Sequence, residues 1–460
     1  MDIRAANMVL ALWLLLAALA EASHDSCPHS LNEASPTASG YLTINASSGS
    51  KMFYAYYEAI DADAGASMPR PPHGHMSQPP TEDDEGNGTG TPIVLWLQGG
   101  PGCSGMFGNF YELGPWRVSE DGCLYRNPAP WNQIFGLLFL DNPVGAGFSI
   151  APFTEDIPTD QDRVAHDIYI ALQEFYALFP DFRKRPFYVT GESYAGKYVP
   201  SVSSYIINKQ SEEVDPSRRL RLDGAAIGNG LTHPIVQVQD HGPTAYHMGL
   251  IDEIQKQTAD AIAAKAVALI QQENWMDAHD ARNELLNYIQ NVTGLATLYN
   301  IGRKIAYHVT ANGTDYLKDF MNRKDVQISL LKAEPGVWED CNSTVGARLA
   351  SDVPKSTMHL VEFLLNHSVP VLLYQGQFDL RDGVSSNEAW IRLLKWKELD
   401  SFYASERKVW QEDGLTVGYV RSFSFLTHVV ISDAGHLVPT DQAYASQQMI
   451  EHWITSKGSV

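Results

Sequence analysis

Residues 187–196 read FYVTGESYAG, and this stretch decides the predicted fold. Its first four residues are aromatic or β-branched, as in a short buried strand, and a helix-like stretch follows from Tyr198. Ser193 lies between the two, among small neighbours. A sharp turn from strand to helix needs small neighbours, and it lifts a serine hydroxyl clear of the sheet. The stretch therefore predicts a nucleophile elbow at Ser193, with Ala195 where the general pattern has glycine.

Strand and helix patterns alternate on both sides of the elbow. Residues 162–179 carry apolar side chains at helical spacing, so we expect a helix there. The aromatic-rich segments 40–44 and 52–57 predict two strands. Short continuous apolar runs, typical of buried strands, occupy 93–97, 137–140, 369–374 and 426–431. The alternation predicts an α/β fold with a largely parallel central sheet and helices on both faces.

Two segments depart from this alternation. From about residue 232 to 345, apolar residues follow helical spacing with no strand pattern between them, which predicts an inserted helical cap. Residues 61–91 are rich in Pro, Gly, Asp, Glu and Ser, which predicts a flexible surface insertion. We expect residues 23–460 to form one catalytic domain that carries both insertions.

The N-terminus and the net charge indicate where the protein works. Arg4 precedes an apolar run over residues 8–20, and residues 20–22 (AEA) form a small-x-small cleavage pattern, so residues 1–22 are predicted to be a secretory signal peptide. No later segment looks long and apolar enough for a membrane anchor. The formal net charge of −21 disfavours nucleic acid as a partner. We expect a protein of the secretory pathway, either extracellular or in the vacuole or lysosome.

Sequons and cysteines fit an exported protein. Six Asn-x-Ser/Thr sequons are predicted glycosylation sites: Asn45, Asn87, Asn291, Asn312, Asn342 and Asn366. The four cysteines are Cys27, Cys103, Cys123 and Cys341. In an oxidising compartment they allow two disulfides with three possible pairings. They lack Cys-x-x-Cys spacing, so no metal site is predicted, and no cofactor is expected.

Two later segments supply partners for Ser193. Asp379 ends the segment LYQGQFD, just after a buried strand, and His436 lies in DAGHLVP after another. The chain order Ser193, Asp379, His436 is the order of the catalytic residues in α/β-hydrolases. In that arrangement the histidine takes the serine proton and returns it to the leaving group, while the acid holds the imidazole tautomer. Asp382 is an alternative acid, but the end of the strand favours Asp379.

Residues 96–105, WLQGGPGCSG, predict the rest of the reaction centre. Dense glycine directly after a buried strand exposes backbone N–H groups. An oxyanion hole needs one such donor and the N–H after the nucleophile, which predicts Gly100 and Tyr194. A phosphate-binding loop is the competing use of such glycines, but no Gly-Lys-Ser/Thr follows and Pro101 removes a donor.

Several motifs in the right order resemble the serine carboxypeptidases. They are residues 96–104, 141–149, 191–196, 228–230 and 435–436, and the resemblance runs from about residue 40 to the C-terminus. In this chain the motifs carry Gln98, Gly105 and the segment YQGQFD at 374–379. With these residues they are most similar to the plant serine carboxypeptidase-like and animal vitellogenic-like branch. The resemblance implies an α/β-hydrolase fold with a helical cap inserted after Gly230. It also implies an enzyme that removes single residues from the C-termini of peptides and proteins.

The resemblance further implies a site for the terminal carboxylate of the substrate. Its members would be Gln98, Gly99, Glu112 and Glu192, with Trp96 in support. Two carboxyl groups close together cannot both ionise cheaply, so the pair would hold a proton and donate a hydrogen bond to the carboxylate. Binding should then weaken as pH rises, which predicts an acidic optimum for peptide hydrolysis.

The same resemblance bears on two other features. The family commonly has Asn where this chain has Gln98, and Gln offers the same amide donor one methylene further out. Pairing of Cys103 with Cys341 is similar to a family link between the glycine-rich loop and the cap. Cys27 and Cys123 are then the cysteines that remain.

Two other functions stay open at this point. Plant members of the family include acyltransferases, which pass the acyl group to an alcohol instead of water. A non-catalytic binding protein on the same fold is the third hypothesis, since fold does not determine function. The complete set of Ser193, Asp379 and His436 argues against that hypothesis. A homodimer is also left open.

Overall fold

The computed structural model describes residues 27–62, 90–215 and 218–456. The predicted signal peptide, nearly all of the predicted 61–91 insertion and the sequon at Asn87 lie outside these residues. Within the described ranges, no helix combines the length and the apolar character that a bilayer crossing requires.

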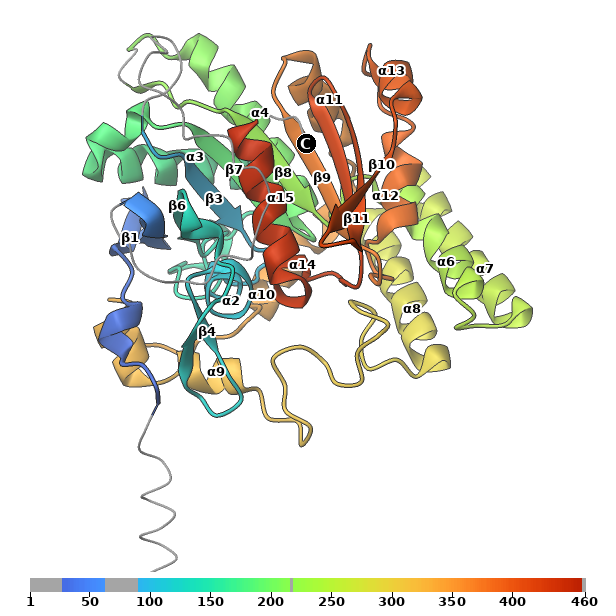
Figure 1. Cartoon of the computed structure of the whole chain (residues 1–460), viewed down its shortest axis with the longest axis horizontal. Coiled ribbons are helices and arrows are strands. Elements are labelled where there is room, and N and C mark those ends of the chain that lie inside the picture. Colours follow the sequence, from blue (N-terminus) through green and yellow to red (C-terminus); the bar gives the residue numbers. More distant parts are fainter. Residues whose placement is uncertain (1–26, 63–89, 216–217, 457–460) are drawn as a thin grey trace, which may run out of the picture.

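A single ten-stranded sheet runs through the molecule in the order β1-β2-β6-β3-β7-β8-β9-β12-β11-β10 (Figure 1). Its central strands are parallel to one another: β6 (Gly136–Leu140), β3 (Ile93–Leu97), β7 (Phe187–Glu192), β8 (Gly224–Gly228), β9 (Val371–Gly376) and β12 (Leu426–Ile431). Antiparallel pairs flank them: β1 (Ala38–Asn45) with β2 (Ser50–Tyr57), and β11 (Leu415–Phe423) with β10 (Lys408–Glu412). The predicted α/β fold with a largely parallel sheet is confirmed.

Strand β8 is the central strand that the sequence pattern does not predict. Its residues GAAIG are mostly small, because neighbouring side chains take the space. A Cβ at Gly224 would lie 2.7 Å from the Trp453 ring. The predicted strand at 369–374 begins two residues later, at Val371, directly after Pro370.

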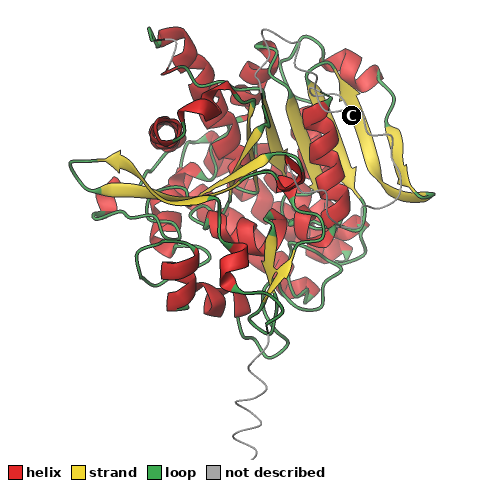
Figure 2. Cartoon of the chain, turned by 60° about the vertical axis from the view of Figure 1, so that its left-hand side comes forward, coloured by secondary structure: helices red, strands yellow, loops and turns green. Residues whose placement is uncertain are grey.

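Side chains along each central strand alternate between two hydrophobic cores, one on each face of the sheet. In β3, Ile93, Leu95 and Leu97 pack on one face, and Val94 and Trp96 pack on the other. The first face is covered by α3 (Gln161–Leu178), α4 (Ala195–Glu212), α11 (Met358–Asn366), α12 (Val384–Ile391) and α13 (Leu399–Ala404). The second is covered by α15 (Ala443–Thr455), α2 (Gly105–Phe107), η3 (Gly108–Leu113) and α9 (Tyr316–Met321). Helices thus lie on both faces of the sheet (Figure 2).

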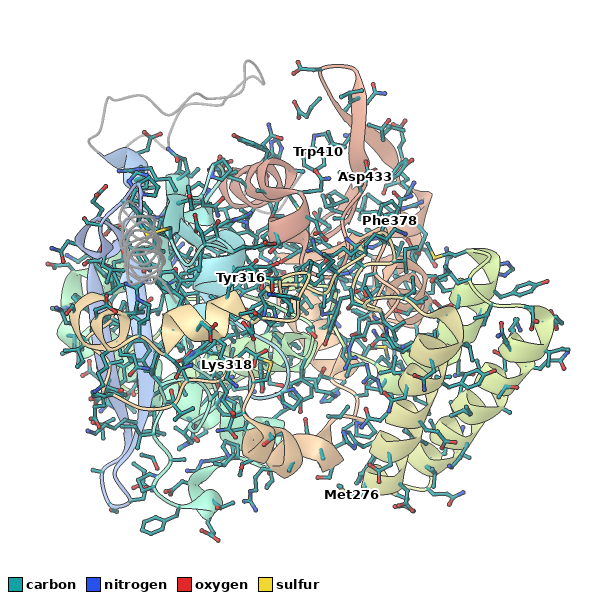
Figure 3. The ribbon with its side chains drawn as sticks, turned by 90° about the horizontal axis from the view of Figure 1, so that it is seen from below. Met276, Tyr316, Lys318, Phe378, Trp410 and Asp433 are labelled. Atoms are coloured by element: carbon teal, nitrogen blue, oxygen red, sulfur yellow. A yellow bond between two sulfur atoms is a disulfide. The ribbon has the colours of Figure 1, made fainter. Side chains whose placement is uncertain are left out.

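The described residues between β8 and β9 form helices and loops, and this segment contains residues 232–345, the predicted cap. Besides α9 and α11 its elements are α5 (Pro234–Gln237), η8 (Val238–Asp240), α6 (His241–His247), α7 (Glu253–Gln271), α8 (Trp275–Thr293), η9 (Val326–Leu330), α10 (Ser343–Leu349) and η10 (Ala350–Asp352). Helices α6, α7 and α8 share a hydrophobic core of their own, in which Ala263 of α7 and Ala281 of α8 are buried. Figure 3 shows this group to one side, with Met276 at its rim.

The remaining elements are short. They are η1 (Leu31–Ala34), η2 (Ile60–Ala62), β4 (Trp116–Val118), β5 (Leu124–Arg126), η4 (Trp131–Gln133), η5 (Thr154–Asp156), η6 (Pro180–Lys184) and α14 (Val438–Asp441). A disulfide joins Cys27 to Cys123, which lies in the turn between β4 and β5. A second disulfide joins Cys103, after β3, to Cys341, just before α10.

Candidate active site

The carboxyl ends of five parallel strands bring the candidate site residues to one edge of the sheet. Gln98 follows β3, Ser193 follows β7 and Asn229 follows β8. Asp379 lies in the loop after β9, and His436 lies in the loop after β12. In open α/β sheets, ligands bind outside the carboxyl ends of the strands, so this is the edge at which a reaction centre is expected.

Ser193 occupies the turn between β7 and α4 with a φ of 63°, in the left-handed region. Its N–H donates to the carbonyl of Gly228 at 2.9 Å, and its own carbonyl accepts from the N–H groups of Gly196 and Leu231, each at 2.9 Å. Surrounding bonds of this kind are what hold a non-glycine residue in a sparsely populated conformation. Ser193 is half-buried, whereas its neighbours Glu192 and Tyr194 are buried.

Close packing explains the glycines around this turn. A Cβ at Gly191 would lie 2.4 Å from the carbonyl oxygen of Leu97. A Cβ at Gly99 would lie 2.7 Å from both the Cβ of Ser193 and the backbone nitrogen of Tyr194. The glycine-rich loop after β3 therefore lies directly against the serine turn, and only glycine allows the two backbones to approach this closely.

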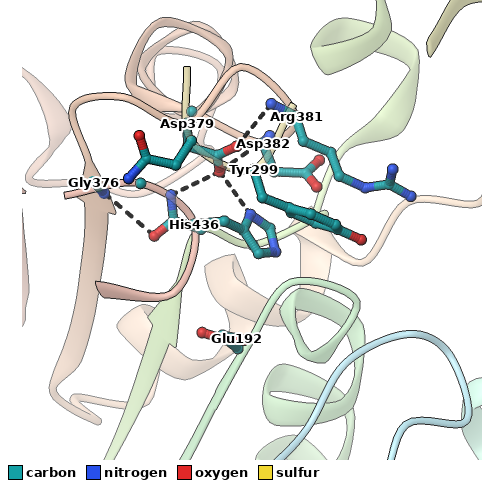
Figure 4. A network of polar contacts seen from close by, with 12 residues as sticks. Glu192, Tyr299, Gly376, Asp379, Arg381, Asp382 and His436 are labelled. Atoms are coloured by element: carbon teal, nitrogen blue, oxygen red, sulfur yellow. Dashed lines mark hydrogen bonds and ion pairs between the residues drawn. The ribbon is translucent and has the colours of Figure 1, made fainter. Parts of the chain in front are cut away.

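Asp379 and His436 form a buried pair (Figure 4). Nδ1 of His436 lies 2.7 Å from Oδ2 of Asp379, and Nε2 of the same ring is buried with no hydrogen-bond partner. The backbone N–H of His436 donates to the carbonyl of Tyr299 at 2.7 Å, and the two ring centroids are 4.7 Å apart. The imidazole is thus fixed with one nitrogen on an acid, while the other nitrogen can accept a proton.

Asn229 belongs to this network, although its motif at 228–230 assigned it no role. Its Nδ2 donates to Oδ2 of Asp379 at 2.8 Å, and its Oδ1 accepts from the N–H of Gly376 at 3.3 Å. The φ of Asn229 is 44°, a conformation that Asn adopts more readily than most residues. The sequence signal that could have identified Asn229 is its place between two glycines, which indicates a tight turn with a left-handed residue.

The two candidate acids have different partners. Oδ1 of Asp379 accepts from the N–H of Arg381 at 2.7 Å, and Oδ2 accepts from the N–H of Asp382 at 3.3 Å. The Asp382 side chain lies 3.5 Å from the buried guanidinium of Arg282, and burial raises the pKa of Asp382. Asp379 is therefore the acid on the imidazole, and Asp382 contributes a backbone donor to it.

The two candidate oxyanion donors come from the glycine-rich loop and from the residue after the serine. Gly100, with a φ of 109°, follows the glycine that packs on Ser193, and Tyr194 is the next residue along the chain. The Tyr194 hydroxyl donates to Oδ2 of Asp352 at 2.6 Å. Because Asp352 ends η10, this bond ties the residue that carries one candidate donor to the helical segment between β8 and β9.

Gln98 joins two buried glutamates. Its Nε2 donates to Oε1 of Glu112 at 3.1 Å and to Oε1 of Glu192 at 2.9 Å. Its Oε1 accepts from the indole N–H of Trp96 at 2.8 Å, which fixes the orientation of the amide. Both amide protons of Gln98 therefore point to the glutamates. In the structure this amide holds the pair, and the donation of a hydrogen bond from Gln98 to a substrate carboxylate stays a prediction.

Glu112 reaches the pair from η3, which is wound as a π-helix. A Cβ at Gly108, where η3 begins, would lie 2.3 Å from Nε1 of Trp96, so a larger residue would displace the indole. Arg117 donates from Nη2 to the carbonyls of Glu112 at 2.6 Å and Pro439 at 2.7 Å. Arg117 thereby ties the carboxyl pair to the chain that follows His436.

The electrostatics of the pair favour a bound proton. Burial raises the pKa of Glu112 to about 7. Burial, and after it the negative charge of Glu112, raises the pKa of Glu192 well above its ordinary value. The two carboxyls also act on each other's ionisation, so it is costly for both to be charged at once. At acidic pH the pair therefore carries at least one proton and can donate a hydrogen bond.

One other cluster has residue types that could hold a metal ion. Ligand atoms of His308, Asp315 and Asp340 lie within 4.8 Å of one another. Asp315 lies 3.2 Å from Nδ1 of the imidazole, whereas Asp340 lies 3.9 Å from Nε2. The carboxylates thus face opposite nitrogens of the ring, which suits two separate contacts with the imidazole better than a single shared metal ion.

Five of the six sequon asparagines lie in the described residues. Asn291, Asn312 and Asn366 are exposed, and Asn45 and Asn342 are half-buried. Glycosylation at these positions stays a prediction.

Comparison with known proteins bears on the function of this site. A family model described as serine carboxypeptidase matches residues 28–456. Serine carboxypeptidase-like 50 of Arabidopsis thaliana is 46% identical over 429 residues, which cover 93% of this chain and 89% of that protein. The probable serine carboxypeptidase CPVL of Dictyostelium discoideum is 32% identical, with 92% of this chain and 79% of that protein covered.

The solved structure of Kex1(delta)p, a prohormone-processing carboxypeptidase from Saccharomyces cerevisiae, is similar over 93% of each chain, with a TM-score of 0.78 and 25% identity. This likeness confirms the predicted α/β-hydrolase fold. The resemblance inferred from the motifs is confirmed as well. Since the family model spans nearly the whole chain, this chain belongs to the serine carboxypeptidase family and is a serine-type carboxypeptidase.

Proposed function

We propose that the enzyme releases single residues from the C-termini of peptides and proteins through an acyl-enzyme on Ser193, and that it works best at acidic pH. The observation that carries the proposal is the buried pair of Glu112 and Glu192, which Gln98 holds together. Glu192 is the residue directly before Ser193. A protonated carboxyl pair beside a nucleophile can bind a free carboxylate. It therefore distinguishes the last residue of a peptide from internal ones.

The proposed reaction begins at the serine hydroxyl. Nε2 of His436 takes the proton of Ser193 Oγ as that oxygen bonds to the carbonyl carbon of the last peptide bond. Asp379 stabilises the imidazolium that results. The backbone N–H groups of Gly100 and Tyr194 would donate to the oxyanion, and stabilisation of this kind is usually the largest single contribution to the rate.

Collapse of this intermediate releases the C-terminal amino acid. His436 gives its proton to the leaving nitrogen, the C–N bond breaks, and the rest of the peptide stays as an ester on Ser193. Water then attacks the ester while His436 takes one of its protons, and the same proton returns to Ser193 Oγ as the C–O bond breaks. The shortened peptide leaves with a new terminal carboxylate.

In this proposal the Glu112–Glu192 pair and the backbone N–H of Gly99 bind the substrate carboxylate. Gln98 and Trp96 hold the pair in position. When the pair is protonated it donates a hydrogen bond to the carboxylate; when both glutamates are ionised they repel it. As pH rises through about 7, where the pKa of Glu112 lies, the affinity should fall. An acidic optimum for peptide hydrolysis follows.

The proposed site of action is the secretory pathway, in the extracellular space or in a vacuole or lysosome. Support comes from two disulfides, which persist in oxidising compartments, and from the sequons that lie on exposed asparagines. An acidic vacuole or lysosome would also match the protonation that the carboxyl pair requires.

A comparison of free and blocked C-termini tests the proposal. The glycosylated enzyme and its Ser193→Ala variant are incubated across a pH series with N-blocked dipeptides, either with a free C-terminus or with a C-terminal amide. We expect release of the C-terminal residue from the free acid at acidic pH, and a loss of about ten-thousand-fold or more in the variant. Equal rates on the acid and the amide would contradict the recognition step.

An acyl acceptor in the same assay separates hydrolysis from acyl transfer. Activated esters are supplied together with an alcohol, and the products are resolved by mass spectrometry. We expect the free acid to be the main product, because the proposal assigns deacylation to water. Ester exchange without peptide cleavage would instead make the enzyme an acyltransferase.

A further inference from the structure

Tyr374 carries a buried hydroxyl that makes no hydrogen bond. The residue lies in β9, its side chain is fully buried, and its hydroxyl has no partner. Its ring packs near Trp131, with 6.4 Å between the centroids. Buried polar groups in folded proteins are nearly always paired, so an unpaired hydroxyl calls for an explanation.

The register of three parallel strands aligns this tyrosine with the carboxyl pair. Glu192 of β7 is paired with Gly228 of β8, and Gly228 is paired with Tyr374 of β9. Residues in register on adjacent strands lie on the same face of a sheet, and neighbouring strands are about 4.8 Å apart. The three residues therefore form a row across one face, with the glycine in the middle.

The glycine leaves room for the tyrosine to cross β8. A Cβ at Gly228 would lie 2.3 Å from Cζ of Tyr374 and 2.5 Å from its hydroxyl oxygen. The tip of the tyrosine ring thus occupies the space above Gly228, which brings its hydroxyl next to the strand that carries Glu192. Any larger residue at 228 would exclude the tyrosine from this position.

Glu192 presents a matching acceptor. Its Oε1 accepts from Gln98, but its Oε2 is buried and receives no hydrogen bond from an amide, a hydroxyl or a backbone N–H. The same holds for Oε2 of Glu112, so these two oxygens are the ones left for the proton that the carboxyl pair holds. Once that proton leaves, a buried negative charge remains, and the Tyr374 hydroxyl is the adjacent unpaired donor.

We propose that Tyr374 is a positioning residue of the carboxylate site, whose hydroxyl donates a hydrogen bond to Glu192 when the Glu112–Glu192 pair loses its proton. This inference rests on the proposed function and deepens it. A hydrogen bond to the ionised form favours ionisation. Tyr374 therefore lowers the pH at which the pair loses its proton, and it sets the upper pH limit of carboxylate binding.

The other charged groups that face the pair come from three further elements. They are Arg117 from β4, Asp379 from the loop after β9, and His436 from the loop after β12. A Tyr374→Phe substitution leaves all three in place and keeps the aromatic ring over Gly228. Because it removes a hydroxyl that has no partner, we expect the variant to fold as stably as the parent.

The test compares the pH dependence of the parent enzyme and Tyr374→Phe. The alkaline limb of kcat/KM on a blocked dipeptide with a free C-terminus is measured, and the protonated carboxyls are titrated by infrared spectroscopy without substrate. We expect both midpoints to move upward by about one pH unit in the variant. Tyr188→Phe, a buried tyrosine at the other end of β7, is the matched control and should leave both midpoints unchanged.

A double variant and the two readouts separate the possible failures. In a Glu192→Gln background, Tyr374→Phe should no longer move either midpoint, because the acceptor charge is gone. An infrared midpoint in Tyr374→Phe that is unchanged or lower than in the parent would overturn the role of the tyrosine. An infrared midpoint that moves while the kcat/KM limb does not would support the tyrosine and overturn the proposed function of the pair.

Discussion

The side-chain amide of Asn229 donates a hydrogen bond of 2.8 Å to Oδ2 of Asp379, the same oxygen that faces Nδ1 of His436 at 2.7 Å. This contact joins β8 to the loop after β9. It fixes the acid in the position from which it holds the imidazole. In the proposed reaction this carboxylate stabilises an imidazolium, so the hydrogen bond would act on the barrier through Asp379.

The first prediction therefore concerns Asn229→Gly. Glycine tolerates the φ of 44° at this position, so the substitution removes the side chain without straining the turn. Hydrogen bonds to charged groups contribute about 1.5–3 kcal/mol, so we expect kcat/KM on a blocked dipeptide to fall by about tenfold or more. Asp413→Gly replaces another left-handed residue, in the exposed turn between β10 and β11, and should leave kcat/KM unchanged. Normal activity in Asn229→Gly would show that Asp379 needs no such support.

The elbow and the order of Ser193, Asp379 and His436 could be predicted because each depends on local residue types in chain order. An apolar strand, a small-residue turn and a helix are adjacent in the sequence, so their pattern survives without any tertiary information. The parallel sheet follows from the same alternation. These parts of the fold and of the candidate site needed no knowledge of which side chains meet.

The contacts of Asn229, Gln98 and Tyr374 could not be predicted in the same way. The contacts of Asn229 and Tyr374 depend on the register of neighbouring strands, and a single chain pattern does not specify register across β7, β8 and β9. Strand β8 is also too poor in large apolar residues to be recognised, because Tyr374 and Trp453 fill the space beside its glycines. The distances from Gln98 to the two glutamates depend on how η3 packs. The sequence alone therefore predicts only that the Gln98 amide donates to the substrate carboxylate.

The second prediction tests the close approach of the glycine-rich loop to the serine turn. A methyl group from Gly99→Ala would lie 2.7 Å from the Cβ of Ser193, so one of the two backbones must move. A misplacement of about 1 Å at a reacting group can lower the rate by about a hundredfold, and we expect a loss of this order in kcat. Gly336→Ala is the matched control, because no atom lies within 4 Å of the new methyl group. Unchanged kcat in Gly99→Ala would contradict the tight packing.

The third prediction separates the two disulfides. Cys103 is bonded to Cys341 across 238 residues, and a Cβ at Gly100 would lie 2.7 Å from Sγ of Cys103. The double variant Cys103→Ser/Cys341→Ser should lose about 2–4 kcal/mol of unfolding free energy and should also lower kcat, because the candidate oxyanion loop is no longer tied down.

The second disulfide provides the control. Cys27→Ser/Cys123→Ser removes a link at the β4–β5 turn, outside the candidate oxyanion loop, so we expect lower stability with kcat retained. Denaturant unfolding and steady-state kinetics on the parent and the two double variants check both statements. Equal effects on kcat from the two double variants would contradict the link between Cys103 and the oxyanion loop.

The fourth prediction concerns stability and pH. In the folded enzyme burial raises the pKa of Glu112 to about 7 and that of Asp141 to about 6. Unfolded carboxyl groups titrate near about 4, so between about pH 4 and 7 the folded state binds more protons than the unfolded state. These two groups therefore stabilise the fold fully at low pH, and the contribution is lost as pH rises through their folded pKa values.

Glu112→Gln isolates this effect, because glutamine keeps the shape of the side chain and cannot ionise. As the pH rises from about 4.5 to 7.5, the variant should become steadily more stable relative to the parent. In the parent, unfolding lets Glu112 release a proton that the folded state holds, so rising pH favours unfolding of the parent alone. Calorimetric Tm values for both proteins across this range measure the difference. Glu174→Gln, at an exposed position on α3, should run parallel to the parent at every pH. If Glu112→Gln also ran parallel to the parent, Glu112 would have to be ionised in the folded enzyme across this range, which would contradict the pKa of about 7 that burial gives it.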